Sequence, residues 1–208
     1  AAPGFGADNP WTLSARNLQA QILGRLGRNA EGLERIDDVV GRLMVISGAD
    51  HTDTLSSRQV QADLLSALGR AHEARAIYVE LAEQLSRHPR HGPTSELALN
   101  VQQSLSHLLF AEGRSGEAEP IVRNVVSAWE LAGDAPSRYE LMAGRLLLAR
   151  VLVDLGHDDE ATGVLNKLLG SPAYDNEVDA DGGVVHAVHG LLLEIESRRT
   201  QSNEGANV

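Results

Sequence analysis

Residues 48–58 read GADHTDTLSSR, and residues 6–16 read GADNPWTLSAR, which is an earlier copy of the same pattern. A Leu-Gly-Arg triplet follows each copy at the same distance, so that matching positions lie 42 residues apart. The Gly-Arg doublet returns at Gly113, and a Gly-His version stands at Gly156, after steps of 44 and 43 residues. Self-similarity at this period is typical of an array of stacked helical repeats.

Each copy predicts two helices joined by a glycine turn. In the first copy, Asp8 or Asn9 can cap the first helix, and Pro10 suits its first turn. Gly27 ends this helix, because glycine reaches the left-handed conformation without steric cost, and a second helix is expected over 29–46. The same pattern predicts turns at Gly27, Gly69, Gly113 and Gly156.

The sequence therefore predicts an all-α fold, an α–α superhelix of four helix pairs plus a C-terminal capping helix. We expect one repeat domain over 6–198, with repeats at 6–47, 48–90, 91–132 and 133–170, a cap helix at 183–198 and a disordered tail at 199–208. The connector 87–93 contains two prolines and predicts either a bend in the array or a domain boundary. The chain starts without Met, and we interpret it as part of a longer protein.

The composition argues against nucleic acid and anionic membranes as partners. The chain has 208 residues and a formal net charge of −11, whereas both of those partners need clustered Lys and Arg. No apolar run approaches the roughly 18 residues of a membrane span, so no membrane association is expected. Cysteine is absent, which excludes disulfides and thiolate metal sites. We expect a cytoplasmic protein.

The order Asp-His-x-x-Thr-Leu-x-x-Arg, small residue, Leu-Gly-Arg and Glu-Ala resembles the tetratricopeptide repeat (TPR). The 42-residue period is similar to the kinesin-light-chain type, which is common in bacterial regulators. The resemblance covers residues 6–170 and implies that helices approach closely at the small residues of the family. On the first helices of the repeats these are Ala20, Ala62, Ser106 and Ala149, and on the second helices they are Gly32, Ala74, Ala118 and Ala161. The chain departs from the family at Gln19 and Gln61, where a buried Leu is usual; Leu105 and Leu148 keep it.

The resemblance also implies that an extended peptide or partner protein binds in a concave groove lined by the first helices. The positions that match this groove are Asn17, Gln21, Arg25, Gln59, Asp63, Gln103, His107, Phe110 and Arg150. Asn17, Gln59 and Gln103 fall in register and could form an amide ladder that bonds a peptide backbone. The alternative for all of these residues is a merely solvated helix face.

Three arginines recur where the wider family often has a large aromatic residue: Arg16, Arg58 and Arg145. They could bind anions as a row. We favour the interpretation in which their stems pack between helices and their guanidinium groups pair with neighbouring carboxylates.

No motif for catalysis or cofactor binding is present. The chain lacks a Gly-x-Ser-x-Gly elbow, a cysteine nucleophile and a phosphate-binding glycine loop. His186 and His189 have a spacing that can ligate Zn or Ni, but the sequence fixes no third ligand, and we interpret them as surface histidines. We therefore expect no enzyme activity, no cofactor and no metal.

The leading hypothesis is a protein–protein interaction scaffold within a larger bacterial regulatory or signalling protein. The alternative is an array that senses a small ligand or peptide and controls an upstream NTPase or DNA-binding domain. A third hypothesis is a self-associating structural array. The last helix, at 183–197, is apolar on more than one side, so it predicts a homodimer or a partner contact as well as a cap.

Overall fold

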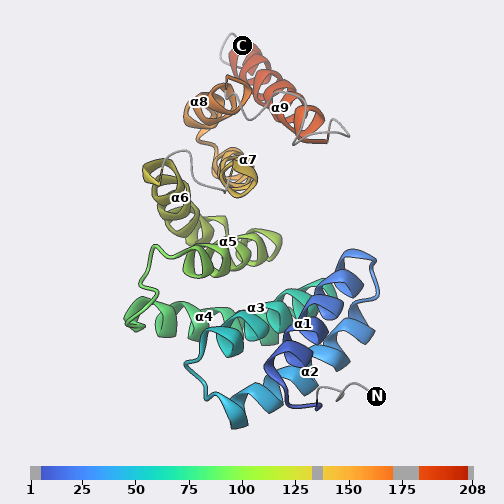
Figure 1. Ribbon diagram of the computed structural model, residues 1–208. Coiled ribbons are helices and arrows are strands. Elements are labelled where there is room, and N and C mark those ends of the chain that lie inside the picture. Colours follow the sequence, from blue (N-terminus) through green and yellow to red (C-terminus); the bar gives the residue numbers. More distant parts are fainter. Residues whose placement is uncertain (1–5, 133–137, 171–182, 206–208) are drawn as a thin grey trace. The chain divides into compact units, whose positions relative to one another are not determined.

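The computed structural model describes residues 6–132, 138–170 and 183–205 of the chain. Within these ranges the chain forms α-helices and no strand, which confirms the all-α prediction (Figure 1). The helices are α1 (Pro10–Arg25), α2 (Asn29–Ile46), α3 (Thr52–Ala67), α4 (Ala71–Arg87), α5 (Glu96–Ala111), α6 (Ser115–Leu131), α7 (Arg138–Asp154), α8 (Asp158–Leu169) and α9 (Gly183–Gly205). Residues 171–182, between the fourth predicted repeat and the predicted cap helix, lie outside the described residues.

The helices form two compact units, Ala1–Leu108 and Leu109–Val208, and the division falls inside α5. The connector at 87–93, which the sequence offered as a domain boundary, lies within the first unit. One continuous array over 6–198 stays a prediction.

Glycine turns join the helices of each predicted pair. The φ angles of Gly27, Gly69, Gly113 and Gly156 are 73°, 76°, 73° and 76°. Side chains rarely tolerate this left-handed conformation, so glycine is required there. The next residue then closes the preceding helix, as when the Arg28 amide donates to the Leu23 carbonyl at 2.9 Å. The four predicted turns are confirmed.

The arginine after the glycine turn has a structural role that the sequence did not reveal. Arg28 pairs with Glu31, Arg70 with Glu73 and Arg114 with Glu117, each across one helical turn at 2.5–2.7 Å. Each glutamate lies in the first turn of a second helix, where a negative charge complements the helix dipole. The Gly-Arg doublet therefore ends one helix and starts the next.

In the first unit, α2 packs between α1 and α3, and α3 packs on α4. Small residues let these helices approach closely. Ala20 and Ala62 are fully buried, as predicted. A Cβ built on Gly32 would lie 3.1 Å from the Ala20 carbonyl oxygen and 3.1 Å from the Leu64 side chain. A larger residue at Gly32 would therefore push α2 away from its neighbours.

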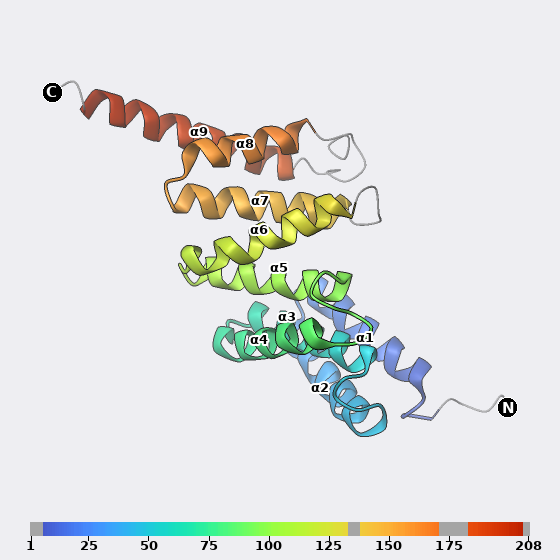
Figure 2. The same ribbon diagram turned by 90° about the vertical axis from the view of Figure 1, so that its left-hand side faces the viewer.

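In the second unit, α7 packs against α6 and α8, and α9 packs on α7 and α8 (Figure 2). The core of this unit includes Trp129 of α6, which is 7% exposed, and Ala149 of α7, which is fully buried. Among the α9 residues whose burial the structure describes, Val188 and Ile195 are buried. The structure thus places α9 over the fourth helix pair, where a cap was predicted.

The last helix is longer than predicted. The sequence favoured a cap helix at 183–198 and a disordered tail from residue 199, whereas α9 continues to Gly205. Two arginines explain the difference. Arg198 donates to the Val153 carbonyl at 2.6 Å, and Arg199 pairs with Asp159 at 2.5 Å, so α7 and α8 hold a segment that is polar in sequence.

Enlarging the buried small residues should destabilise the fold. Ala62→Leu and Ala149→Leu should each lower the free energy of unfolding by about 1–3 kcal/mol, because both alanines are fully buried and a Leu would overpack the contact. Thermal unfolding followed by circular dichroism measures the loss. Ala76→Leu, at an exposed position of α4, is the control and should change little. Unchanged melting of both buried variants would contradict the repeat register.

The capping role of α9 should depend on its buried face. Ile195→Ala should cost about 2–5 kcal/mol, because Ile195 is 1% exposed and its removal leaves a cavity over α7 and α8. Leu193→Ala on the same helix should cost under about 0.5 kcal/mol, because Leu193 is 65% exposed. If the two variants lose equal free energy of unfolding in chemical denaturation, the side of α9 that carries Ile195 does not cover the fourth helix pair. Deleting 183–208 should lower the melting temperature or cause aggregation.

Candidate binding surface

A cavity of about 500 Å³ opens in the first unit between α1, α2, α3 and α5. Four of the predicted groove residues line it: Gln21 and Arg25 from α1, and Gln59 and Asp63 from α3. Each couple is spaced by four residues, so its two side chains lie one above the other on one helix face. The register of the repeat thus brings these four residues to one cavity.

Two of these side chains are available to a ligand. The Arg25 guanidinium is exposed and makes no ion pair with the described residues. The Gln59 amide is half-buried and makes no hydrogen bond to the described part of the chain. A cationic donor and an amide, which both donates and accepts, therefore face one space.

Asp63 has a different role, because it is already held by its neighbours. The Tyr78 hydroxyl of α4 donates to Asp63 at 2.5 Å, and Ser104 of α5 also bonds to the carboxylate. Burial raises the pKa of Asp63 above its ordinary value, and the bonds from Tyr78 and Ser104 oppose that rise. Burial and the nearby carboxylate raise the pKa of Tyr78 as well. Asp63 joins three helices at the wall of the cavity.

Asn17 lies in a smaller neighbouring cavity of about 210 Å³ rather than with Gln59. Its amide donates to Ser57 Oγ at 2.7 Å and accepts from Gln21 at 2.9 Å. The three side-chain amides of the predicted ladder therefore differ in their surroundings. Asn17 is committed to the contact between α1 and α3, and only Gln59 of the three ladder residues lines the larger cavity.

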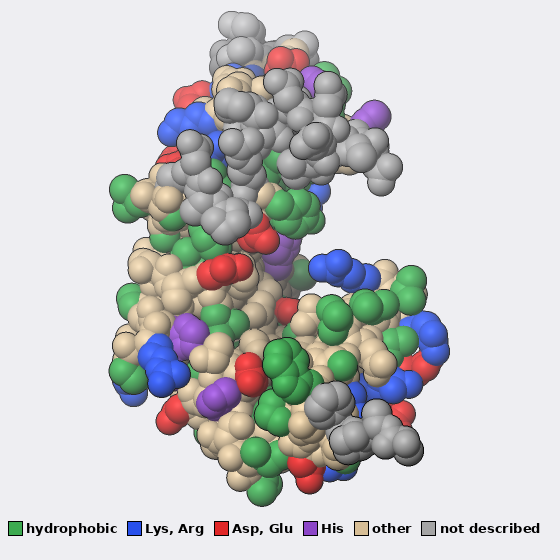
Figure 3. Space-filling model, in the orientation of Figure 1, with side chains coloured by type: hydrophobic (Ala, Val, Ile, Leu, Met, Phe, Trp, Pro, Cys, Tyr) green, Lys and Arg blue, Asp and Glu red, His purple; other side chains and the backbone are tan. Residues whose placement is uncertain are grey.

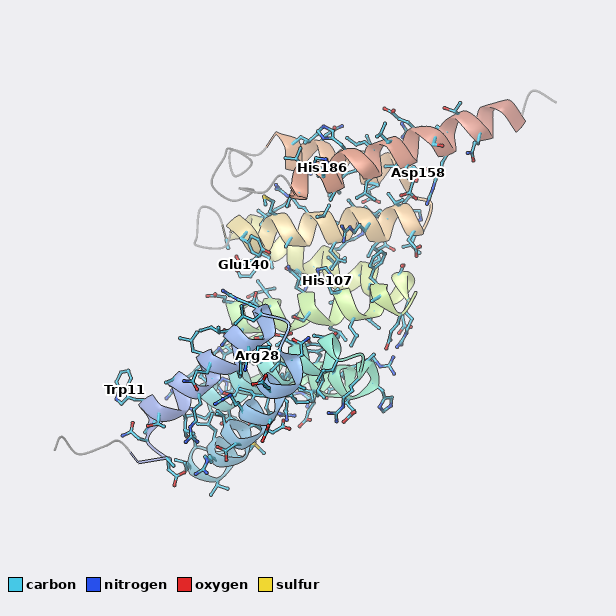
Figure 4. The ribbon with its side chains drawn as sticks, turned by 90° about the vertical axis from the view of Figure 1, so that its right-hand side faces the viewer. Trp11, Arg28, His107, Glu140, Asp158 and His186 are labelled. Atoms are coloured by element: carbon cyan, nitrogen blue, oxygen red, sulfur yellow. The ribbon has the colours of Figure 1, made fainter. Side chains whose placement is uncertain are left out.

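The other predicted groove residues do not line the larger cavity. His107 is exposed on α5 (Figure 4). Gln103 is half-buried, and its Oε1 atom is buried without a hydrogen-bond partner in the described residues. Phe110 and Arg150 belong to the second unit. A groove that includes all of them stays a prediction.

No model of a known protein family matches the chain, and no curated protein matches it. Solved structures do. Nearly identical TPR-like repeats of a Podosopora anserina protein, assigned as a kinesin light chain, superpose with a TM-score of 0.73 at 20% identity, over 94% of this chain and 90% of that chain. A variant of that protein gives 0.68 at 19% identity, over 92% and 96%. BtubC (BKLC) from P. vanneervenii gives 0.69 at 15% identity, over 76% of this chain and 62% of that chain.

The fold is that of a TPR-like repeat protein. This agreement covers most of the chain and confirms the resemblance that the repeated residues carried. At these identities the likeness establishes the fold alone.

The arginine row of this TPR-like fold forms ion pairs with neighbouring helices. Arg58 is 9% exposed and bonds Glu80 at 2.6 Å and Gln84 at 2.9 Å, both on α4. The other two pairs are Arg16 with Asp38 and Arg145 with Glu130, each at 2.9 Å. These contacts confirm the interpretation in which the arginines pair with carboxylates, and an anion-binding row is not supported.

Sequence reasoning missed part of the cavity lining: Gly24, Asn29, Ser56, Val60, Leu64, Ala67 and Asn100. A signal for two of them exists. Ser56 and Asn100 are related by the 44-residue step between the second and third TPR-like repeats, and they precede Gln59 and Gln103 by three residues. Extending the ladder face by one helical turn would have found both.

His186 and His189 are exposed on α9, and Figure 4 labels His186. The described residues include no group of three His, Asp or Glu placed to hold a metal ion. None of the described helices is long and apolar enough to cross a membrane.

Removing the Tyr78 hydroxyl should destabilise the first unit in a pH-dependent way. Tyr78→Phe leaves the Asp63 carboxylate short of a donor, which should cost about 1–3 kcal/mol at pH 7. Burial raises the folded-state pKa of Asp63 above the unfolded value of about 3.9, so the folded state binds this proton more tightly and loses stability as pH rises through the folded pKa. Tyr78→Phe raises that pKa further. The free energy of unfolding that the variant loses relative to the parent chain should therefore become smaller as the pH falls toward 4.

Urea unfolding of both proteins at pH 7 and pH 4.5 measures this effect, with Tyr139→Phe as the matched control at an exposed tyrosine. If Tyr78→Phe loses the same free energy of unfolding at both pH values, the Tyr78 hydroxyl does not stabilise the charged carboxylate of Asp63.

Proposed function

We propose that the chain is a protein–protein interaction scaffold that binds an extended peptide segment of a partner in the cavity between α1, α2, α3 and α5. The observation that carries the proposal is the pair of available side chains, Arg25 and Gln59, in one cavity of about 500 Å³. A volume of this size is within the range of ligand sites and takes a few amino-acid residues of a bound segment.

The lining suits a peptide more than an apolar ligand. Amide and hydroxyl side chains from four helices surround the space, and they can donate to and accept from a peptide backbone. Val60, Leu64 and Ala67 add a small apolar wall for one side chain. Arg25 gives the cavity a positive charge that no carboxylate of the described residues pairs with, so an acidic side chain of the peptide fits beside it.

The net charge limits the peptide further. A chain with a formal charge of −11 repels strongly acidic segments at long range. We therefore propose a neutral or basic segment with one acidic residue placed for Arg25. The larger context, a bacterial regulatory or signalling protein, is part of the same proposal, and it rests on the sequence resemblance.

A displayed library of random 12-residue peptides, selected on the full chain, tests the proposal. Selected peptides should bind the chain and lose about tenfold or more in affinity to Arg25→Ala, because a charge-assisted hydrogen bond is worth about 1.5–3 kcal/mol. Gln59→Ala should weaken binding by a smaller factor. Arg87→Ala removes an exposed arginine from the end of α4 and is the control. If the selected peptides bind the parent and all three variants with equal affinity, the cavity is not their binding site.

The alternative of a sensor array is favoured by the same cavity volume, which also suits a single small molecule of amino-acid size. Thermal-shift screening against amino acids and dipeptides tests it, since a ligand that binds the folded state raises the melting temperature. The homodimer through α9 also stays a proposal. It rests on exposed Leu193 and is tested by light scattering of the parent and Leu193→Ala.

A further inference from the structure

The cavity between α1, α2, α3 and α5 is lined by charged groups of both signs, Arg25 and Asp63. Arg25 suits an acidic residue of a bound segment. Asp63 carries the opposite charge, and its carboxylate bonds to two hydroxyl groups but to no basic side chain of the described residues. Basic and acidic side chains, blue and red, lie near each other beside the end of α1 on the face shown in Figure 3. A bound segment therefore meets one charge of each sign in one space.

The contacts of Asp63 leave its carboxylate able to accept further hydrogen bonds. The Tyr78 hydroxyl donates to it at 2.5 Å, and Ser104 also bonds to it. An ionised carboxylate has about four lone-pair directions, so two hydroxyl donors occupy about half of them. Both donors are neutral, and a half-buried carboxylate without a cation is costly. A cation that enters the cavity would supply both the missing donors and the missing charge.

The side chains around Asp63 also accept hydrogen bonds. Ser56 and Gln59 precede it by seven and four residues, so the three side chains lie on one face of α3, and all of them line the cavity. Asn100 lines the cavity from α5. Their hydroxyl and amide oxygens can accept from an ammonium or guanidinium group. Among the described residues that line the cavity, none of those on α3 or α5 is basic, so this wall suits a cation.

The cation that fits is an organic one rather than a metal ion. Asp63 is the one carboxylate among the described lining residues, and calcium or magnesium sites normally use several oxygen ligands with more negative charge. A lysine or arginine side chain of a bound segment needs one carboxylate and a few neutral acceptors, which this wall provides.

The repeat register separates the two charges of the cavity. At the 42-residue period, Gln21 corresponds to Asp63 and Arg25 corresponds to Ala67. Asp63 therefore lies on the neighbouring first helix, one helical turn away from the level of Arg25. Packed helices lie about 8–10 Å apart and four residues rise about 6 Å, so the two Cα atoms are about 10–12 Å apart. An extended segment covers such a distance in about three residues.

We propose that Asp63 binds a basic side chain of the same peptide segment whose acidic residue pairs with Arg25. The acidic residue lies toward α1, and the basic residue lies toward α3 and α5, about three positions away. This assignment rests on the proposed function, because it specifies the peptide that the same cavity takes. The formal net charge of −11 favours it, since a basic residue offsets the long-range repulsion of the acidic one.

Two parallel selections from one library of random 12-residue peptides test the proposal, one on the parent chain and one on Asp63→Asn. Asn keeps an oxygen that can accept from the Tyr78 hydroxyl, and circular dichroism checks the fold of the variant. Peptides selected on the parent should be enriched in Lys or Arg about three positions from an Asp or Glu. Peptides selected on Asp63→Asn should keep the acidic residue and lose the enrichment of the basic one.

A matched variant controls for the net charge of the chain. Glu83→Gln also removes one negative charge, from an exposed position of α4, and Glu83 does not line the cavity. It should select the same peptides as the parent. If Glu83→Gln loses the basic enrichment as strongly as Asp63→Asn, the overall charge selects basic peptides and the proposal is overturned.

A double-mutant cycle on the tightest peptide selected on the parent then measures the contact itself. Replacing the basic residue of that peptide by Gln should weaken its binding to the parent about tenfold, because a hydrogen bond to a charged group is lost. The same replacement should change binding to Asp63→Asn less than about twofold. If Asp63→Asn melts below the assay temperature, Asp63→Gln takes its place, since Gln21 stands at the equivalent position of the first repeat.

The outcomes separate this assignment from the proposed function. An equal loss on the parent and on the Asp63 variant would overturn the role of Asp63, and the proposed function would stand if binding still depends on Arg25. Selected peptides that bind equally well without Arg25 and without Asp63 would overturn both.

Discussion

The close approach of helices at small residues is the constraint on which the first unit depends. Gly24 and Gly32 leave space that the Leu64 side chain fills, and Ala20 and Ala62 are buried where larger residues would separate the helices. This spacing sets the distance between α1 and α3, and therefore the width of the cavity between them. A methyl group added at Gly24 would have to displace Leu64, which also lines that cavity.

Polar contacts then fix the register between successive helix pairs. Asn17 bonds Ser57, Gln61 bonds Asp37, and Asp63 is held by Tyr78 and Ser104. An apolar interface alone tolerates small sliding movements, whereas each of these bonds is satisfied in one register only. At Gln61, where the repeats that the chain resembles usually have a buried Leu, the chain has a directed bond to Asp37 in place of apolar packing.

Local sequence predicted the helices and turns because their causes are local. A left-handed glycine or a capping asparagine acts within a few residues, and the second helix runs from Asn29 to Ile46 as expected. The site was predicted only in part, because its decisive contacts are distant in sequence. The partner of Asn17 is 40 residues away, and the end of α9 depends on acceptors in α7 and α8. Periodicity gives the face of a helix, but it does not show which polar groups on that face are already bonded.

The two tryptophans of the chain occupy opposite environments, and each belongs to a different unit. Trp11 is 76% exposed on α1, and Trp129 is 7% exposed in α6. Their fluorescence therefore reports on separate events without any added label. The buried indole of Trp129 senses the packing of the second unit. The emission of Trp11 instead senses what reaches the outer side of α1, so a soluble quencher distinguishes the two signals within one sample.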